Sequence, residues 1–106
     1  MDMDLQKEVE SFISRNDLDC ELPYRLIDLA SEMGELSKEL LKQTDYGNEN
    51  FNNQKPGEEW KQEIGDVFFT LIALANSTDV DLGECLSASM HKYRERLERK
   101  GDIGSE

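Results

Sequence analysis

The sequence predicts a single all-α domain built as a four-helix bundle. Apolar residues recur at helical spacing in four segments, and no stretch keeps the alternation of a β-strand over several residues. The length of 106 residues allows one modest hydrophobic core, and therefore one domain over residues 1–106. Charged residues make up 34% of the chain and hydrophobic residues 37%, which is typical of a folded helical protein and not of a disordered one.

The first two helices are predicted over about 3–14 and from Leu22 to about Thr44. Pro23 suits the first turn of the second helix, where its missing N–H would have no partner in any case. The second helix also carries a seam of apolar residues that steps by four and three, as bundle helices do. The seam consists of Leu22, Leu26, Leu29, Met33, Leu36 and Leu40.

A polar connection over residues 45–57 separates the second helix from a third, predicted over about 58–77. The connection is rich in Asn and Gly and is long for so small a domain, so we expect a functional or mobile loop. From Val67 to Ala75 the third helix is almost entirely apolar. One small domain can hardly surround such a helix, and we therefore expect this helix to lie at a subunit interface.

The fourth helix is predicted to start after Asp81 and to end at Lys100. Asp81 with Glu84 three residues later resembles a capping box, and Gly101 suits the left-handed stop that follows many helices. Residues 101–106 then form a short tail that is either flexible or folded over the site.

Two similar acidic motifs stand beside the apolar seams of the second and third helices. "EMGEL" supplies Glu32 and Glu35, and "EIGDV" supplies Glu63 and Asp66. If the two helices pack by their seams, the four carboxylates share one groove, where their repulsion would be relieved by a divalent cation. Ligands that are all oxygen suit Mg²⁺, or alternatively Mn²⁺. A single E-x-x-E pair is more often a solvated helix face paired with lysines, so the interpretation depends on having two such pairs.

Each motif also contains a glycine, Gly34 or Gly65, within a predicted helix. Glycine destabilises a helix interior by about 1 kcal/mol, and we interpret both as sites where another helix approaches closely. The neighbouring acids are expected to be surface charges: Asp28, Glu39, Glu58 and Glu59.

The fourth helix concentrates positive charge. Five of the twelve Lys and Arg residues fall within 92–100, and Lys92 and Arg96 lie beside its apolar seam. They could bind phosphate oxygens. They could equally stabilise the helix C-terminus or pair with Glu95 and Glu98.

Composition excludes several classes of function. The net charge of −12 disfavours nucleic-acid binding, and no apolar run is long enough to span a membrane. No export leader opens the sequence, and two scattered cysteines, Cys20 and Cys85, indicate reduced thiols in a cytoplasmic protein. The lone His91 offers neither a zinc site nor a di-iron motif.

The acid pairs, the helix order and the basic last helix together resemble the MazG-like nucleotide pyrophosphohydrolases of the all-α NTP pyrophosphatase superfamily. The resemblance covers roughly residues 22–100 and includes "VFFTLIALANSTDVDLGECL" and "KYRER". It implies Mg²⁺ bound by Glu32, Glu35, Glu63 and Asp66, with Glu32 or Glu35 as the general base. It also implies Lys92 and Arg96 as the phosphate-binding cations, and a homodimer or homotetramer as the assembled protein.

The resemblance further implies hydrolysis of an NTP or dNTP between the α and β phosphates, as housekeeping of the nucleotide pool. Phe12, Tyr24, Tyr46 and Phe51 are aromatic candidates for contacting the base, although packing explains each of them as well. Two alternatives stay open. One is a phosphoribosyl-ATP pyrophosphohydrolase on the same scaffold, and the other is a non-catalytic helical module that binds a nucleotide or a partner.

Overall fold

The computed structural model describes residues 4–50 and 57–105, and every regular element in these ranges is an α-helix. The helices are α1 (Asp4–Arg15), α2 (Leu22–Gln43), α3 (Glu58–Ser77) and α4 (Leu82–Lys100). The all-α prediction is therefore confirmed, and the helix bounds agree closely with those expected from the sequence. Within the same ranges no helix is long and apolar enough to cross a membrane.

The helix ends follow the local chemistry of the sequence. Pro23 lies in the first turn of α2. The carboxylate of Asp81 caps α4 by accepting a hydrogen bond of 3.0 Å from the backbone N–H of Glu84. Gly101 ends α4 in the left-handed conformation with φ 84°, and its N–H donates to the Leu97 carbonyl at 3.0 Å.

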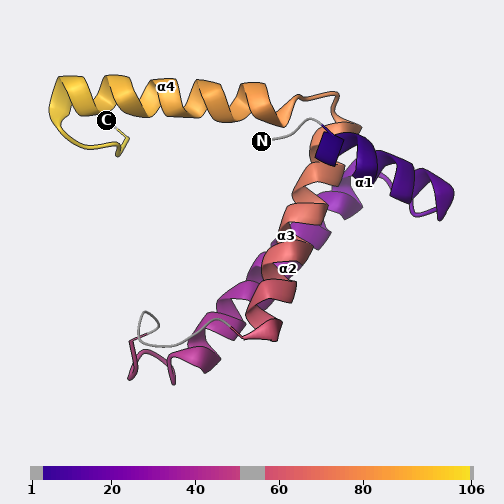
Figure 1. The fold of residues 1–106 in the computed structure, drawn as a ribbon, viewed down its shortest axis with the longest axis horizontal. Helices are drawn as coiled ribbons and strands as arrows, with labels where there is room; N and C mark the ends of the chain where they lie inside the picture. Colours follow the sequence, from indigo (N-terminus) through magenta and orange to yellow (C-terminus); the bar gives the residue numbers. More distant parts are fainter. Residues whose placement is uncertain (1–3, 51–56, 106) are drawn as a thin grey trace.

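Helices α2 and α3 form a long antiparallel pair, and α1 packs across α3 near one end of that pair (Figure 1). The best-buried apolar side chains belong to α1 and α3: Ile13, Ile72, Ala73 and Ala75. The rings of Phe12 and Phe69 meet edge to face with centroids 5.9 Å apart. The core of one chain is thus small and lies where α1 crosses α3.

Helix α4 does not complete a bundle with the other three helices of its own chain. It runs away from the α2–α3 pair and packs along none of the other helices (Figure 1). The radius of gyration is 16.8 Å, whereas a compact chain of this length has one of about 13 Å. The accessible surface is 7926 Å², and a compact protein of this mass exposes roughly 6,100 Å². A single chain therefore leaves surface exposed that a closed bundle would bury.

The seam predicted for α2 is only partly the face that meets α3. The buried or half-buried positions are Arg25, Leu29, Glu32, Leu36, Glu39 and Gln43. Leu26, Met33 and Leu40 are instead 56%, 54% and 40% exposed. The contact with α3 is rotated toward the acids, because the apolar stripe of α2 is wider than one neighbouring helix can cover.

The exposed part of the seam continues onto α3 as one surface, which we call the apolar face. Its members are Leu22, Leu26, Met33 and Leu40 of α2 with Ile64, Phe68 and Leu71 of α3, each between 37% and 56% exposed. At about 100° per residue these side chains lie on one flank of the α2–α3 pair, and the acids lie on the other. Such a large exposed apolar surface is typical of an interaction surface.

The interpretation of the glycines is wrong within one chain. A Cβ atom added to Gly34 or to Gly65 would meet nothing within 4 Å. Both residues lie on exposed parts of their helices, turned away from the α2–α3 contact. They therefore do not set the spacing between these two helices. Cys20 and Cys85 are free and exposed.

A hydrogen-bond network around Gln6 fixes the junction between α3 and α4. Its side-chain amide donates to Asn76 Oδ1 and to the Val80 carbonyl, each at 2.9 Å. Its Oε1 accepts from the backbone N–H of Leu82 at 2.9 Å, and Asn76 Nδ2 returns a bond to the Gln6 carbonyl. One residue of α1 thus holds the end of α3 and the first residue of α4 together.

Candidate metal centre

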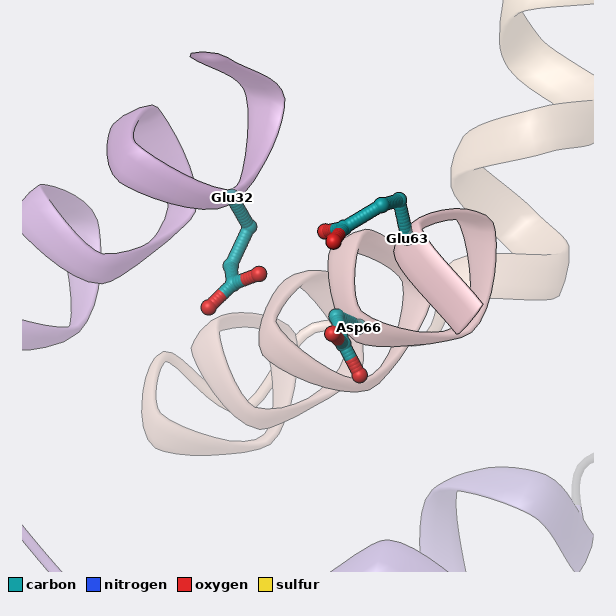
Figure 2. Close-up of side chains that lie close together, drawn as sticks. All are labelled: Glu32, Glu63 and Asp66. Atoms are coloured by element: carbon teal, nitrogen blue, oxygen red, sulfur yellow. The ribbon is translucent and has the colours of Figure 1, made fainter. Parts of the chain in front are cut away.

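Three carboxylates meet on the flank of the α2–α3 pair opposite the apolar face. Glu32 of α2 points toward Glu63 and Asp66 of α3 (Figure 2). One carboxylate oxygen from each lies within 4.8 Å of the other two. Glu63 and Asp66 are three residues apart and therefore share one face of α3. Glu32 lies on the side of α2 that meets α3, so the three carboxylates come together.

The cluster is electrostatically strained without a cation. The pKa of Glu63 is raised above its ordinary value of 4.5, first by desolvation and then by the charges of Asp66, Glu32, Glu35 and Glu39. Glu32 and Glu63 are half-buried and Asp66 is exposed, so an ion could enter from solvent. A hard divalent cation fits this set, because all the donors are oxygens and the repulsion that raises the pKa of Glu63 would be offset.

The fourth acid of the two motifs, Glu35, lies outside the cluster of three. It is exposed on α2, one turn after Glu32, and it contributes to the raised pKa of Glu63. Among the predicted surface charges, Asp28, Glu58 and Glu59 are exposed as expected. Glu39 is not, because its side chain is only 12% exposed and forms an ion pair of 3.5 Å with Lys42.

The structure does not bring the predicted phosphate-binding cations to the acids of the same chain. Lys92 and Arg96 lie on α4, which projects away from the α2–α3 pair (Figure 1). The guanidinium of Arg96 donates to the Ile103 carbonyl at 3.0 Å, and the Lys92 ammonium lies 5.1 Å from the centre of the Tyr93 ring. Of the acids proposed as partners on α4, Glu95 pairs with His91 at 3.1 Å.

An open groove lies along α1, where α1 packs against Phe69 of α3. It has a volume of about 830 Å³ and is lined by Lys7, Glu8, Val9, Ser11, Phe12, Arg15 and Phe69. Phe69, the lining residue from α3, comes one helical turn after Asp66. Of the other aromatic candidates, Tyr24 and Tyr46 are exposed and Phe51 lies outside the described residues.

Sequence reasoning missed the buried cation Arg25. It is only 9% exposed, its Nη2 donates to the Leu18 carbonyl at 3.0 Å, and Asp28 lies 4.0 Å from Nη1. Its place three and seven residues before Asp28 and Glu32 puts it on the α3-facing side of α2. The spacing of Arg25 from Glu32 is the one indication of this position in the sequence.

Comparison with known proteins agrees with this geometry. The model of the MazG nucleotide pyrophosphohydrolase domain matches residues 23–100. The uncharacterized protein YpjD of Bacillus subtilis strain 168 is 34% identical over 94 residues, which are 88% of this chain and 83% of YpjD. The crystal structure of B. subtilis YpjD, a candidate pyrophosphatase, superposes with a TM-score of 0.71 at 33% identity, covering 88% of this chain and 95% of that one. The chain therefore belongs to the MazG nucleotide pyrophosphohydrolase family.

Proposed function

We propose that the protein hydrolyses a nucleoside triphosphate, NTP or dNTP, to the monophosphate and pyrophosphate, and that it requires Mg²⁺ (or Mn²⁺). The observation that carries the proposal is the convergence of Glu32, Glu63 and Asp66 within 4.8 Å in a chain of the MazG family. These three residues would hold the divalent ion. When bound, the ion would acidify the attacking water and offset charge on the phosphates.

The remaining roles belong to residues around the cluster. Water attacks the α phosphorus, the bond to the α–β bridging oxygen breaks, and pyrophosphate leaves with that oxygen. Glu35, one turn from Glu32 and outside the cluster, would orient the water and accept its proton. Lys92 and Arg96 would bind the oxygens of the phosphate tail.

The groove between α1 and α3 would receive the nucleoside. Phe12 and Phe69 offer an aromatic wall next to Asp66, and the groove is open enough for a base and a sugar. Base stacking on aromatic side chains is worth about 1–3 kcal/mol and tolerates different bases. This arrangement supports binding of the nucleoside without naming the preferred base.

The active form would be a homodimer or a homotetramer that works in the cytoplasm, where nucleotides are processed. The apolar face supports this proposal, because its seven side chains need a covering surface. A standard interface buries about 800 Å² on each partner, less than the roughly 1,900 Å² by which this chain exceeds a compact protein.

The proposal is tested by product analysis over a panel of canonical and modified NTPs and dNTPs, with phosphoribosyl-ATP included. We expect pyrophosphate and a monophosphate in equal amounts, only when Mg²⁺ or Mn²⁺ is present. Release of orthophosphate would contradict the site of cleavage. Turnover of phosphoribosyl-ATP alone would favour the alternative pyrophosphohydrolase, and no turnover at all would favour a binding module.

A further inference from the structure

We infer that the C-terminal tail, residues 101–105, is a positioning element that orients the guanidinium of Arg96 for binding phosphate oxygens. The inference rests on the proposed function, in which Arg96 binds the triphosphate. It gives a role to a segment that lies outside the four helices. Ile103 of the tail acts through Arg96 and does not itself touch the substrate.

The C-terminal tail reverses direction at the end of α4. Gly101 takes the left-handed conformation with φ 84°, which residues with a side chain rarely adopt. Figure 1 shows the chain after this residue turning back beneath the end of α4. The C-terminal tail therefore lies against the helix that carries Arg96 and does not extend away from it.

Lys100, the last residue of α4, holds the C-terminal tail in this reversed position. Its ammonium lies 3.4 Å from Asp102 Oδ1 and donates to the Ser105 carbonyl at 3.2 Å. Asp102 Oδ1 also accepts a hydrogen bond of 3.0 Å from the backbone N–H of Gly104. The C-terminal tail is thus attached to α4 on both sides of Ile103.

Between these two attachments the Ile103 carbonyl reaches the side chain of Arg96. Arg96 Nη1 donates to this carbonyl at 3.0 Å. Arg96 is half-buried, whereas Lys92 and Arg99 on the same helix are exposed. Because α4 packs along none of the other helices, the C-terminal tail and α4 itself provide this cover. A long side chain with many rotamers is held in one orientation.

The contact with Ile103 leaves Arg96 able to bind phosphate. The bond uses Nη1, and Nε and Nη2 have no hydrogen-bond partner among residues 4–50 and 57–105. These two nitrogens form one edge of the planar fork with which arginine binds phosphate through two hydrogen bonds. The orientation that the tail fixes is therefore compatible with binding.

The chemistry of the contact favours positioning over inhibition. A carbonyl is neutral, so the guanidinium of Arg96 keeps its full positive charge for the phosphates. Asp102 is the one acid within residues 101–105, and it contacts Lys100 instead of Arg96. A tail that blocked Arg96 would be expected to place its carboxylate on that residue. Orienting a side chain before binding reduces the ordering cost of binding, so the effect belongs to substrate affinity.

Two truncated chains test the inference by steady-state kinetics with Mg²⁺ and the best NTP or dNTP of the substrate panel. One chain ends at Gly101 and loses the Ile103 carbonyl, and its KM should rise about fivefold. The matched control ends at Gly104 and keeps that carbonyl, so its KM should change less than about twofold. Asp102→Ala loosens the tail at full length, and its KM should rise about threefold.

A double-mutant cycle separates positioning of Arg96 from a general effect on the fold. In an Arg96→Ala chain, truncation at Gly101 should cause no further change in KM, because the group that the tail orients is absent. In a Lys92→Ala chain, the same truncation should still raise KM about fivefold. A purely structural role of the tail would give equal changes in the two backgrounds.

A second measurement does not depend on activity. The ¹H–¹⁵N heteronuclear NOE of Arg96 Nε, assigned by its loss in Arg96→Lys, reports how ordered the side chain is. It should be high in the full chain and in the chain that ends at Gly104, and close to zero in the chain that ends at Gly101. A mobile Nε in the full chain would overturn the inference.

The kinetic outcomes distinguish this inference from the proposed function. An unchanged KM after loss of the tail, or equal rises in both backgrounds, would overturn the inference and leave the proposed function intact. A lower KM would show that the tail competes with phosphate for Arg96, which would also overturn the inference. Inactivity of the wild-type protein would instead overturn the proposed function.

Discussion

The carboxylates of Glu32 and Asp66 come from different helices and meet within 4.8 Å on one flank of the α2–α3 pair. Neither helix places both acids by itself, so the site exists only when the pair is formed. The same pair of helices also carries the exposed apolar face, so the helices that form the site are those that we expect to form the subunit interface.

Removal of one acid should abolish catalysis and keep the fold. Asp66 is exposed, so Asp66→Ala leaves no cavity and removes one of three candidate ligands. We expect kcat/KM to fall by about 100-fold or more with Mg²⁺. The control is Glu58→Ala, which removes an exposed acid paired with Lys61 at 3.5 Å and should change the rate less than about twofold. Near-normal turnover by Asp66→Ala would exclude Asp66 as a ligand.

The raised pKa of Glu63 should make the metal-free protein less stable as the pH rises. The folded state holds this proton more tightly than the unfolded chain does, so stability falls from about pH 4.5 up to the raised pKa and then levels off. Thermal melting of wild type and of Glu63→Gln over this pH range measures the effect. The melting temperature of the variant should fall less as the pH rises. Saturating Mg²⁺ should remove the difference. Parallel profiles without metal would contradict the prediction.

The Gln6 network should contribute to stability. Gln6→Ala removes the partners of Asn76, Val80 and Leu82, and we expect a loss of about 2 kcal/mol in the free energy of unfolding. Urea denaturation measures this loss. The control is Gln62→Ala on an exposed position of α3, which should stay within about 0.5 kcal/mol of wild type. Equal effects of the two changes would show that the network contributes little.

If the groove between α1 and α3 binds the nucleoside, replacing Phe12 should weaken substrate binding. Phe12→Leu keeps an apolar contact with α3 but removes the aromatic face, so KM for the best substrate should rise about fivefold, for a loss of about 1 kcal/mol of stacking. The value of kcat should change little, because the groove lies beside the reacting phosphates. Steady-state kinetics separates the two, and an unchanged KM would place the nucleoside elsewhere.

If the apolar face is the subunit interface, negative charges introduced on it should prevent assembly. Leu26→Glu together with Phe68→Glu places two acids on a surface whose members are now 56% and 37% exposed. We expect the mass from light scattering to fall to that of a monomer. Lys38→Glu, on an exposed part of α2 outside the apolar face, should leave the mass unchanged. An oligomer that survives the double change would require another interface.

The sequence predicted the helices and their ends well, because capping and spacing are local. Asp81 and Gly101 set the ends of α4 through bonds within a few residues. It also predicted which acids share a face, and three of the four come together. The sequence could not show which helix or subunit packs against each face of a helix. The stripe on α2 is wide enough for two contacts, and its spacing does not say which one lies within the chain.

The same limit explains the other errors. Gly34 and Gly65 were interpreted as sites where another helix approaches closely, although both are exposed. Glu39 was expected in solvent and is largely covered, because the contact with α3 is rotated toward the acids. Gln6 carried no recognisable pattern, since its partners lie 70 to 76 positions later in the chain.

Because Gln6 is 70 to 76 positions from its partners, helix α1 is synthesised long before it can be fixed in place. A ribosome adding about 5–20 residues per second needs several seconds between Gln6 and Leu82. During that time α1 has already been synthesised, but Leu82, which donates a hydrogen bond to Gln6, has not. A helix of 12 residues is marginal alone in water. Helix α1 is thus synthesised several seconds before the residues that fix its position.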